Sequence, residues 1–242
     1  MNTSSNNYVL GFAVVICVAM SATLAVIATA LKPTQQAAAE FDRQKNVMMA
    51  AGLVQEGGTR SRKELEQLYQ ERVEERVIDV TTGQPAADLT PQAVAAMKSD
   101  ADRARYRVVA TTKGDDGKLG AIVLPISGKG LWSTLYGYLA LEGDGNTVRG
   151  ITFYKHGETP GLGGEVENPA WTGLWPGKTI LDQGKLVSIT VKKGVVNPAV
   201  PNEKQHYVDG LSGATITSNG VTKFVRSDLE AFRPYLQQFW SK

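Results

Sequence analysis

The chain has 242 residues, a formal net charge of +2 and 21% charged residues. These charges are spread along the sequence, so the composition does not indicate a nucleic-acid-binding protein. One cysteine, Cys17, and two histidines exclude an intrachain disulfide and a Cys/His metal cluster. Any redox chemistry would therefore need a bound organic cofactor.

The amino-terminal segment is strongly apolar. No Asp, Glu, Lys or Arg precedes Lys32, and Tyr8–Leu31 is 24 residues long. As a helix it would span roughly 36 Å, against a hydrocarbon core of about 30 Å. A cleaved signal peptide is the alternative, with Ala28–Ala30 as an A-x-A site. The lack of a basic n-region and the length of the apolar stretch favour an uncleaved membrane anchor.

The charges beside this anchor bear on its orientation. Lys32, Arg43 and Lys45 follow it, and nothing basic precedes it except the amino terminus. By the positive-inside rule alone, the rest of the chain would be cytoplasmic. Glu40 and Asp42 lie among these cations, so the indication is weak.

Two helices are expected after the anchor. The first covers 37–53 and follows a break at Pro33. The second begins at a capping box formed by Ser61 and Glu64. Its expected apolar face has helical spacing and consists of Leu65, Leu68, Tyr69, Val73 and Val77.

A run of strands comes next, followed by a final helix. The β-branched and aromatic residues predict strands at 106–112, 119–125, 135–141, 148–154 and 186–192. Hairpin turns are expected at "GDDG" (114–117) and "GDGN" (143–146), because Asp, Asn and Gly tolerate positive φ. The last helix is predicted over 219–240, with a kink or restart at Pro234.

The order of these elements indicates an α+β fold. We expect a single N-terminal transmembrane helix followed by a soluble antiparallel-sheet domain flanked by helices. The expected divisions are an anchor at 1–35, a helical segment at 36–105 and the sheet domain at 106–242.

Two glycine-containing loops are candidates for a ligand site. "HGETPGLGGE" (156–165) has four glycines, which permit close backbone approach to a ligand. A merely flexible loop is the alternative. "PISGKGLW" (125–132) ends in Trp132, an aromatic side chain that suits a flat ring. A phosphate loop is excluded, because only three residues separate the glycines of "TGLWPG", and the G-x-G-x-x-G fingerprint is also missing.

A third candidate is the stretch "DGLSGATITSNG" (209–220), where small hydroxyl residues precede a helix. Helix amino termini carry N–H groups without helical partners and attract phosphate. A hydroxyl there could bind a phosphate or be esterified to it. Ordinary capping by Thr217 or Ser218 is the alternative, and the residues alone leave both open.

These motifs resemble those of a known family. "DGLSGATIT" is similar to the flavinylation motif D-G-x-[ST]-G-A-[ST]-x-[ST] of FMN-binding domains, in which a flavin transferase takes FMN from FAD and joins its phosphate to a threonine. "GKGLWSTLYGYLAL" and "GITFYKHGETPGLGGE" also look like this family. With the anchor and the helices after it, almost the whole chain resembles the C subunits of the bacterial sodium-translocating NADH:quinone oxidoreductases.

The resemblance implies roles for individual residues, with 106–242 as the FMN-binding domain. Thr215 would accept FMN through a phosphoester bond. The flanking hydroxyl residues Ser212 and Thr217 would hold the cofactor's phosphate and ribityl chain, and Gly213 and Ala214 between them would also belong to the cofactor site. Other residues would lie along the flavin: Glu158, Thr159, Leu162, Gly163 and Trp132. Asp209 and Gly210 would be read by the transferase. No catalytic residue and no metal site is implied in this chain.

The resemblance also implies a function and a location. The chain would relay electrons within a membrane oxidoreductase, from a metal centre to another flavin on the way to quinone, with no NADH site of its own. Its partners would be the other subunits and a flavin transferase. The soluble domain would lie on the periplasmic side of the bacterial inner membrane, against the weak charge indication.

Two other functions stay open at this point. One is the flavin subunit of the related ferredoxin-oxidising complex. The other is an anchored module that binds a phosphorylated ligand without a covalent bond.

Overall fold

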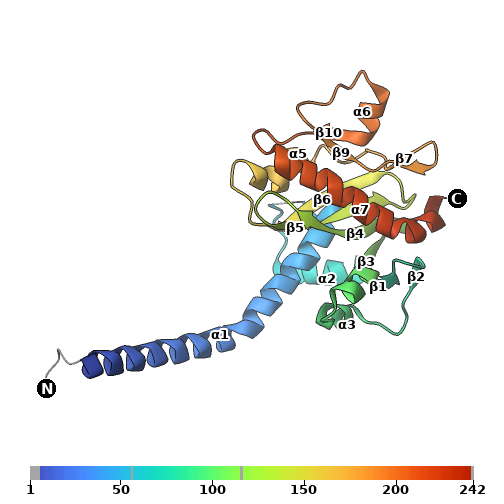
Figure 1. Cartoon of the computed structure of the whole chain (residues 1–242). Helices are drawn as coiled ribbons and strands as arrows, with labels where there is room; N and C mark the ends of the chain where they lie inside the picture. Colours follow the sequence, from blue (N-terminus) through green and yellow to red (C-terminus); the bar gives the residue numbers. More distant parts are fainter. Residues whose placement is uncertain (1–5, 56, 115–116, 241–242) are drawn as a thin grey trace. The chain divides into compact units, whose positions relative to one another are not determined.

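The predicted α+β class is confirmed: a long N-terminal helix precedes an antiparallel sheet that is covered by helices (Figure 1). The computed structural model describes residues 6–55, 57–114 and 117–240. The chain divides into two compact units, one ending at Asp42 and the other beginning at Arg43.

The second unit is built on a six-stranded antiparallel sheet in the order β2-β1-β3-β4-β5-β6. Its strands are β1 (Val73–Asp79), β2 (Gln84–Pro85), β3 (Tyr106–Lys113), β4 (Leu119–Lys129), β5 (Thr134–Glu142) and β6 (Val148–Lys155). The four strands predicted between 106 and 154 are confirmed, and β4 continues past its expected end to Lys129. The turn at 143–146 is confirmed, with Gly145 at φ 64°. Two residues of the other expected turn, Asp115 and Asp116, lie outside the described residues.

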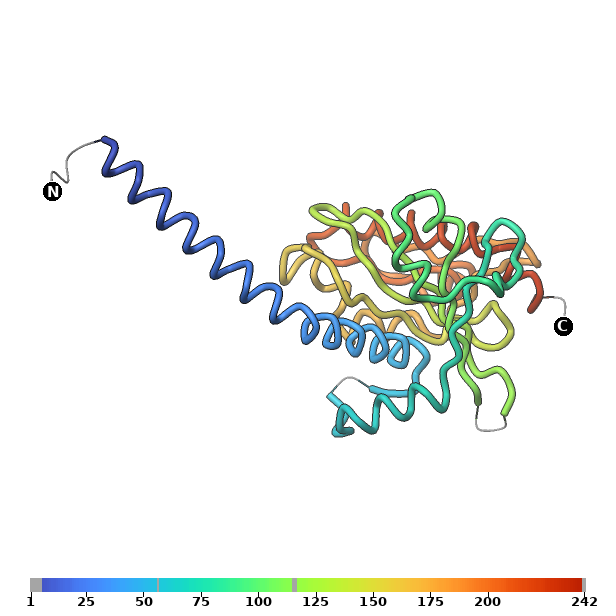
Figure 2. The backbone as a smooth tube through the Cα atoms, turned by 90° about the horizontal axis from the view of Figure 1, so that it is seen from below, coloured from blue at the N-terminus to red at the C-terminus, as the bar shows by residue number. Residues whose placement is uncertain are grey.

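The two faces of this sheet bury their side chains against different helices. Large residues such as Ile122, Leu124 and Leu139 pack against α7 (Thr215–Trp240). On the other face Ala121 and Ala140 pack against the end of α1 (Asn6–Ala50) and against α2 (Arg62–Arg72). Figure 2 shows the end of α1 and α7 on opposite sides of the strands. Successive residues of a strand point to opposite faces, so neighbouring residues of β4 and β5 belong to these two separate clusters.

The second predicted helix is only partly right. Its capping box is present: the Ser61 amide donates to the Glu64 carboxylate at 2.7 Å, and the Glu64 amide donates to the Ser61 hydroxyl at 3.4 Å. The helix ends at Arg72, however, and Val73 and Val77 lie on β1. Two valines four residues apart are compatible with one face of a helix and with one face of a strand. The strand forms because β1 pairs with β3 along seven residue pairs.

Shorter elements connect the sheet to the last helix. They are α3 (Pro91–Ala96), α4 (Asp100–Arg105), η1 (Gly163–Glu167), α5 (Pro169–Thr172), β7 (Leu181–Asp182), β8 (Lys185–Leu186), β9 (Thr190–Lys192), α6 (Pro201–His206) and β10 (Tyr207–Asp209). The single strand predicted at 186–192 is wrong. Ser188 has φ 68°, a left-handed conformation that interrupts extended backbone and separates β8 from β9. β9 then pairs in parallel with β10, which leads into α7.

Helix α7 is held closely against the sheet. It begins at Thr215, four residues before the predicted start, and Pro234 lies inside it. A Cβ at Gly220 would collide with the backbone oxygen of Lys129, so glycine permits close contact between α7 and β4. Further along, the buried Asp228 carboxylate accepts from Arg107 at 2.6 Å and from the Ser127 amide at 2.8 Å. Gly220 thus brings the first turns of α7 close to the end of β4, and Asp228 joins the middle of the helix to the sheet.

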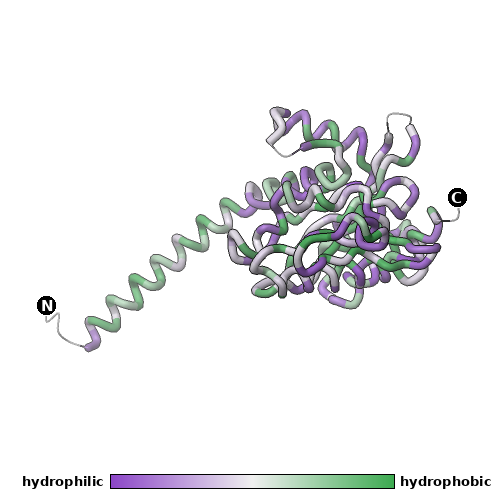
Figure 3. The backbone as a smooth tube through the Cα atoms, turned by 90° about the horizontal axis from the view of Figure 1, so that it is seen from above, coloured by the Kyte–Doolittle hydropathy of each residue, from purple (hydrophilic) through white to green (hydrophobic). Residues whose placement is uncertain are grey.

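The first unit consists of the exposed part of α1. This helix is long and apolar enough to cross a membrane by length and composition (Figure 3). The predicted break at Pro33 is wrong, because Pro33 lies inside one continuous helix. A proline removes a single backbone hydrogen bond and need not end a helix that continues on both sides.

Candidate functional site

Three segments that are distant in sequence meet at the amino terminus of α7. They are the turn between β10 and α7, the loop that follows β6, and the loop between β4 and β5. The carboxylate of Glu158, from the loop after β6, makes hydrogen bonds to the other two. All three sequence-predicted loops therefore belong to one site.

Glu158 is the central side chain of this site, and it is 5% exposed. Its Oε2 accepts from the Thr217 hydroxyl at 2.6 Å and from the Leu131 amide at 3.2 Å. Its Oε1 accepts from the amides of Trp132 at 2.9 Å and Ser133 at 3.1 Å. Burial acts to raise the pKa of Glu158, but these hydrogen bonds to the ionised form outweigh it and leave the pKa lowered. The group is therefore a carboxylate at neutral pH.

Glycines make room for this carboxylate. A Cβ at Gly130 would lie 2.7 Å from Glu158 Oε1. A Cβ at Gly163 would lie 2.7 Å from both Glu158 Oε2 and the Thr217 hydroxyl. Neither position accepts a side chain without displacing the Glu158 hydrogen bonds, which explains the glycine at each of these two positions.

The turn before α7 is held by internal hydrogen bonds, and part of it is exposed to solvent. The Leu211 amide donates to the Ser218 hydroxyl at 3.2 Å, and the Ala214 amide donates to the Leu211 carbonyl at 3.1 Å. Gly213 has φ 70°, and a Cβ there would lie 2.8 Å from Leu162. Ser212 and Thr215 are exposed. The turn thus presents two hydroxyls at the start of a helix.

Neither expected capping residue is free for simple capping. The Thr217 side chain is 1% exposed and donates to Glu158. The Ser218 hydroxyl belongs to a residue that is 4% exposed, and it accepts from Leu211, seven residues earlier. Both hydroxyls instead join the turn to its surroundings.

The first two residues of the motif make contacts of their own. The Asp209 carboxylate accepts from the Val196 amide at 2.7 Å, and the Asp209 carbonyl accepts from the Trp171 indole at 2.8 Å. A Cβ at Gly210 would collide with the backbone oxygen of Lys192. These contacts hold the end of β10 in place.

Exposed apolar side chains surround the Glu158 cluster. They come from all three segments, and their exposed fractions are 44% for Leu131, 67% for Trp132, 43% for Leu162 and 59% for Ile216. Large apolar residues gathered on a surface mark a place where a ligand or partner binds.

The remaining sequence candidates lie nearby. Thr159 is exposed, and its carbonyl accepts from the Gly164 amide at 2.9 Å. His156 accepts the Glu158 amide on Nδ1 at 3.3 Å, the local hydrogen bond of a residue at a strand end. Sequence reasoning did not single out Gly130 and Leu131, and it considered Ser218 only as a helix cap. The signal for Gly130 and Leu131 was the "GKGLW" loop itself, but nothing in the sequence pairs Ser218 with Leu211.

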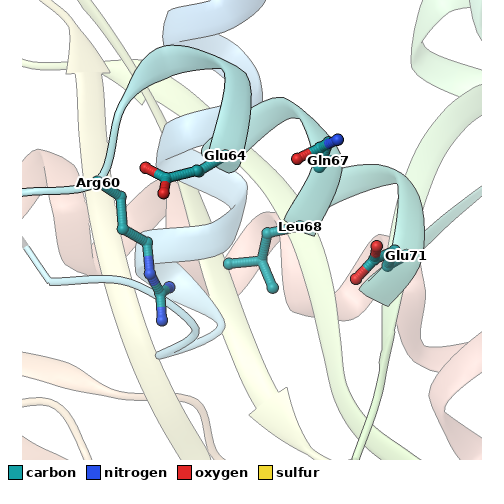
Figure 4. Close-up of a pocket in the computed structure, with 5 residues that line it drawn as sticks. All are labelled: Arg60, Glu64, Gln67, Leu68 and Glu71. Carbon is teal, nitrogen blue, oxygen red and sulfur yellow. The ribbon is translucent and has the colours of Figure 1, made fainter.

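Other parts of the chain offer less for ligand chemistry. An open pocket of about 270 Å³ beside α2 is lined by Arg60, Glu64, Gln67, Leu68 and Glu71, whose side chains are drawn in Figure 4. It contains none of the predicted site residues, and Glu64 is engaged in the capping box. Within the ranges that the structure describes, no group of three or more His, Cys, Asp or Glu could hold a metal ion.

Comparisons with known proteins agree on one family. Residues 130–230 match the FMN-binding domain family. The chain is 42% identical over 241 residues to the C subunit of the Na(+)-translocating NADH-quinone reductase of Pseudomonas aeruginosa, covering 91% of this chain and 90% of that protein. It is 39% identical to the Pasteurella multocida protein of the same name, covering 92% and 90%.

Solved structures give the same result. The crystal structure of the protein of this name from Parabacteroides distasonis superposes with a TM-score of 0.70 at 29% identity, covering 85% of this chain and 96% of that chain. The crystal structure of Shewanella oneidensis NqrC superposes with a TM-score of 0.69 at 33% identity, covering 85% and 100%. The similarity extends over sequence and fold together.

Proposed function

Because this chain belongs to the family of the C subunits of the Na(+)-translocating NADH-quinone reductases, we propose that it carries FMN joined through a phosphoester bond to Thr215. The observation that carries the proposal is the exposure of Thr215 at the first residue of α7, between the buried residues Ala214 and Thr217 that fix the backbone on either side of it. A modifying enzyme would reach Thr215 without unfolding the turn.

The site fits a phosphate at this position. The first intrahelical bond of α7 runs from the Ser218 amide to the Ala214 carbonyl at 2.9 Å. The amides of residues 215–217 precede it and have no acceptor within the helix. They point along the helix axis toward the turn and, with the helix dipole, favour a phosphate diester there. Ser212 and the positive-φ backbone of Gly213 lie on the same turn.

The attachment reaction balances with FAD as the donor. The Thr215 oxygen forms a bond to the phosphorus that bears riboflavin, the pyrophosphate bond of FAD breaks, and AMP leaves. The proton of the hydroxyl goes to a base on the transferase or to solvent. Asp209 and Gly210 would be the part of the motif that the transferase reads.

The flavin would lie over the exposed apolar residues around Glu158. Trp132 and Leu162 offer an aromatic and an aliphatic surface to the ring, and Thr159 and Gly163 lie in the same loop as Leu162. FMN would supply electron acceptance and donation. The protein's own residues would place the ring at the surface, where electrons pass from one centre of the complex to the next on the way to quinone.

The anchor and the location complete the proposal. The proposed divisions are a membrane anchor at 1–35, a segment at 36–105 that contributes α2, β1 and β2 to the soluble part, and the FMN-binding domain at 106–242. The soluble part would lie on the periplasmic side of the bacterial inner membrane and associate with the other subunits. The names of the relatives favour this complex over the related ferredoxin-oxidising one.

Denaturing electrophoresis followed by peptide mass spectrometry tests the attachment. Protein made with its transferase should keep flavin fluorescence in the denatured band, and the peptide containing Thr215 should gain the mass of FMN less one water. Thr215→Ala should abolish both signals. Ser212→Ala is the matched control, because Ser212 carries another exposed hydroxyl on the same turn, and it should keep the flavin. Fluorescent Thr215→Ala protein would refute the proposed site. Fluorescence lost from the wild-type band on denaturation would indicate the non-covalent alternative.

A further inference from the structure

Glu158 has the hydrogen bonding of a structural clamp. Its two oxygens receive four donors, at 2.6, 2.9, 3.1 and 3.2 Å. Three are consecutive amides of residues 131–133, and the fourth is a hydroxyl in the first turn of α7. One carboxylate therefore connects the loop that carries Trp132 to the helix that begins with Thr215.

The arrangement requires a negative charge and cannot be replaced by a neutral side chain of the same shape. All four partners are hydrogen-bond donors, and an ionised carboxylate has only acceptors. A glutamine would turn an NH₂ group toward at least one N–H or O–H donor. Buried donors that lose their acceptor are costly, and hydrogen bonds to charged groups are the stronger kind.

The clamp also restrains the direction of Trp132. The backbone of this residue is bonded to a buried group, whereas its side chain is 67% exposed. The neighbouring amides of Leu131 and Ser133 are bonded to the same carboxylate, so the loop cannot rotate about a single contact. The side chain is thus presented to the surface on a fixed backbone.

We infer that Glu158 is a positioning residue, which holds the Trp132 loop against the first turn of α7 and thereby keeps the indole at the flavin. The placement of the flavin rests on the proposed function above. The clamp itself is a property of the polypeptide and is testable without cofactor. Glu158 acts on the flavin through Trp132, the Thr217 hydroxyl is the contact of the clamp with α7, and the Glu158 side chain itself need not touch the ring.

Hydrogen exchange of the full-length chain in detergent, made without the transferase, tests the clamp. In Glu158→Gln the amides of residues 131–133 should exchange roughly tenfold to a hundredfold faster than in wild type. Asp228→Asn is the matched control, because it alters another buried carboxylate that accepts a β4 amide, that of Ser127. It should leave the exchange of 131–133 unchanged. Unchanged exchange at 131–133 in Glu158→Gln would overturn the inference.

Two conservative substitutions of Thr217 test the clamp independently, so that the inference stays testable even if Glu158→Gln does not fold. Thr217→Ser keeps the hydroxyl donor and should retain slow exchange at 131–133. Thr217→Val removes the donor at nearly the same volume and should accelerate it. Equal exchange in the two variants would show that the hydroxyl does not contribute to the clamp and would overturn this part of the inference.

The flavin-loaded protein tests the positioning role. Glu158→Gln should change the visible circular dichroism and the fluorescence yield of the attached flavin, and Trp132→Ala should do the same. In the double variant the Glu158→Gln change should add nothing, because the residue through which it acts is gone. Additive changes would refute action through Trp132. Failure of wild type to carry FMN would refute the proposed function, and the exchange result would still decide the clamp.

Discussion

Gly163→Ala should destabilise the soluble unit much more than a neighbouring glycine substitution. The new Cβ would lie 2.7 Å from Glu158 Oε2 and 2.7 Å from the Thr217 hydroxyl. Neither atom can move away without breaking the bond between them. Loss of a hydrogen bond to a charged group costs about 1.5–3 kcal/mol, and crowding a packed site costs about 1–3 kcal/mol.

Because the two costs share the same atoms, we expect a total of about 3 kcal/mol. For a unit of this size, this corresponds to a fall in the unfolding temperature of roughly 6–12 °C. Gly161→Ala provides the control in the same loop. Gly161 has φ 74° and no atom within 4 Å of a new Cβ. Gly161→Ala should therefore lower the free energy of unfolding by only about 1 kcal/mol, the cost of placing alanine in a left-handed backbone conformation.

Thermal unfolding of the two variants, followed by far-ultraviolet circular dichroism at neutral pH, measures the difference. Gly163→Ala should also expose the Thr217 hydroxyl and speed amide exchange at residues 131–133, which Gly161→Ala should not do. If both variants lowered the unfolding temperature equally, the packing around Glu158 would be looser than the structure shows, and the reasoning would fail.

Three further predictions concern charge and topology. Asp228→Ala should lower the free energy of unfolding by about 3–5 kcal/mol, because it leaves the Arg107 cation without its partner. Asp228→Asn should lower it less, because the amide carbonyl can still accept from the Ser127 amide of β4; equal losses of the two variants in urea unfolding would contradict this. The folded-state pKa of Glu158 lies below its usual 4.5, so its contribution to stability is present above about pH 4.5 and is lost as pH falls through the folded value. The difference in unfolding free energy between wild type and Glu158→Gln should therefore shrink in acid, and a constant difference would argue against an ionised clamp. A cysteine introduced at the exposed Asp182, with Cys17→Ser, should react with a membrane-impermeant maleimide in intact cells with a permeabilised outer membrane; labelling only after lysis would place the domain in the cytoplasm.

The strands and the last helix were predictable because their periodicity is long and unambiguous. β5 and β6 are rich in β-branched, aromatic and other apolar residues and are joined by a glycine turn, so local sequence defines both the strands and their pairing. Val73 and Val77 were misassigned because two valines four residues apart fit one helix face. Pairing with β3, about thirty residues away, decides their conformation. The predictions at Pro33 and Ser188 failed for a related reason. Local sequence rules predicted a break at Pro33 that α1 does not have, and they did not predict the break at Ser188 that separates β8 from β9.

The candidate site was predictable in its members and not in its connections. The motif around Thr215 and the glycines near Glu158 stand out in the sequence, and each pointed to a ligand. Nothing in the sequence shows that the Glu158 carboxylate accepts the Thr217 hydroxyl, 59 residues away. Such bonds arise from tertiary packing, where a buried acceptor takes whichever donors the fold brings to it.

The openness of this site gives a physical reason for a covalent link. A flavin that exchanges electrons with separate centres needs an exposed edge, and the apolar residues around Glu158 are 43–67% exposed. Small ligands gain affinity by burying most of their surface, so a surface of this kind would bind free FMN weakly. A bond at Thr215 makes the association intramolecular, with an effective concentration in the millimolar range for a short tether. The flavin would then remain at the site however weakly its ring is held. Free FMN added to Thr215→Ala protein should accordingly saturate the site only at millimolar concentration, and tight binding to that variant would remove the reason for the tether.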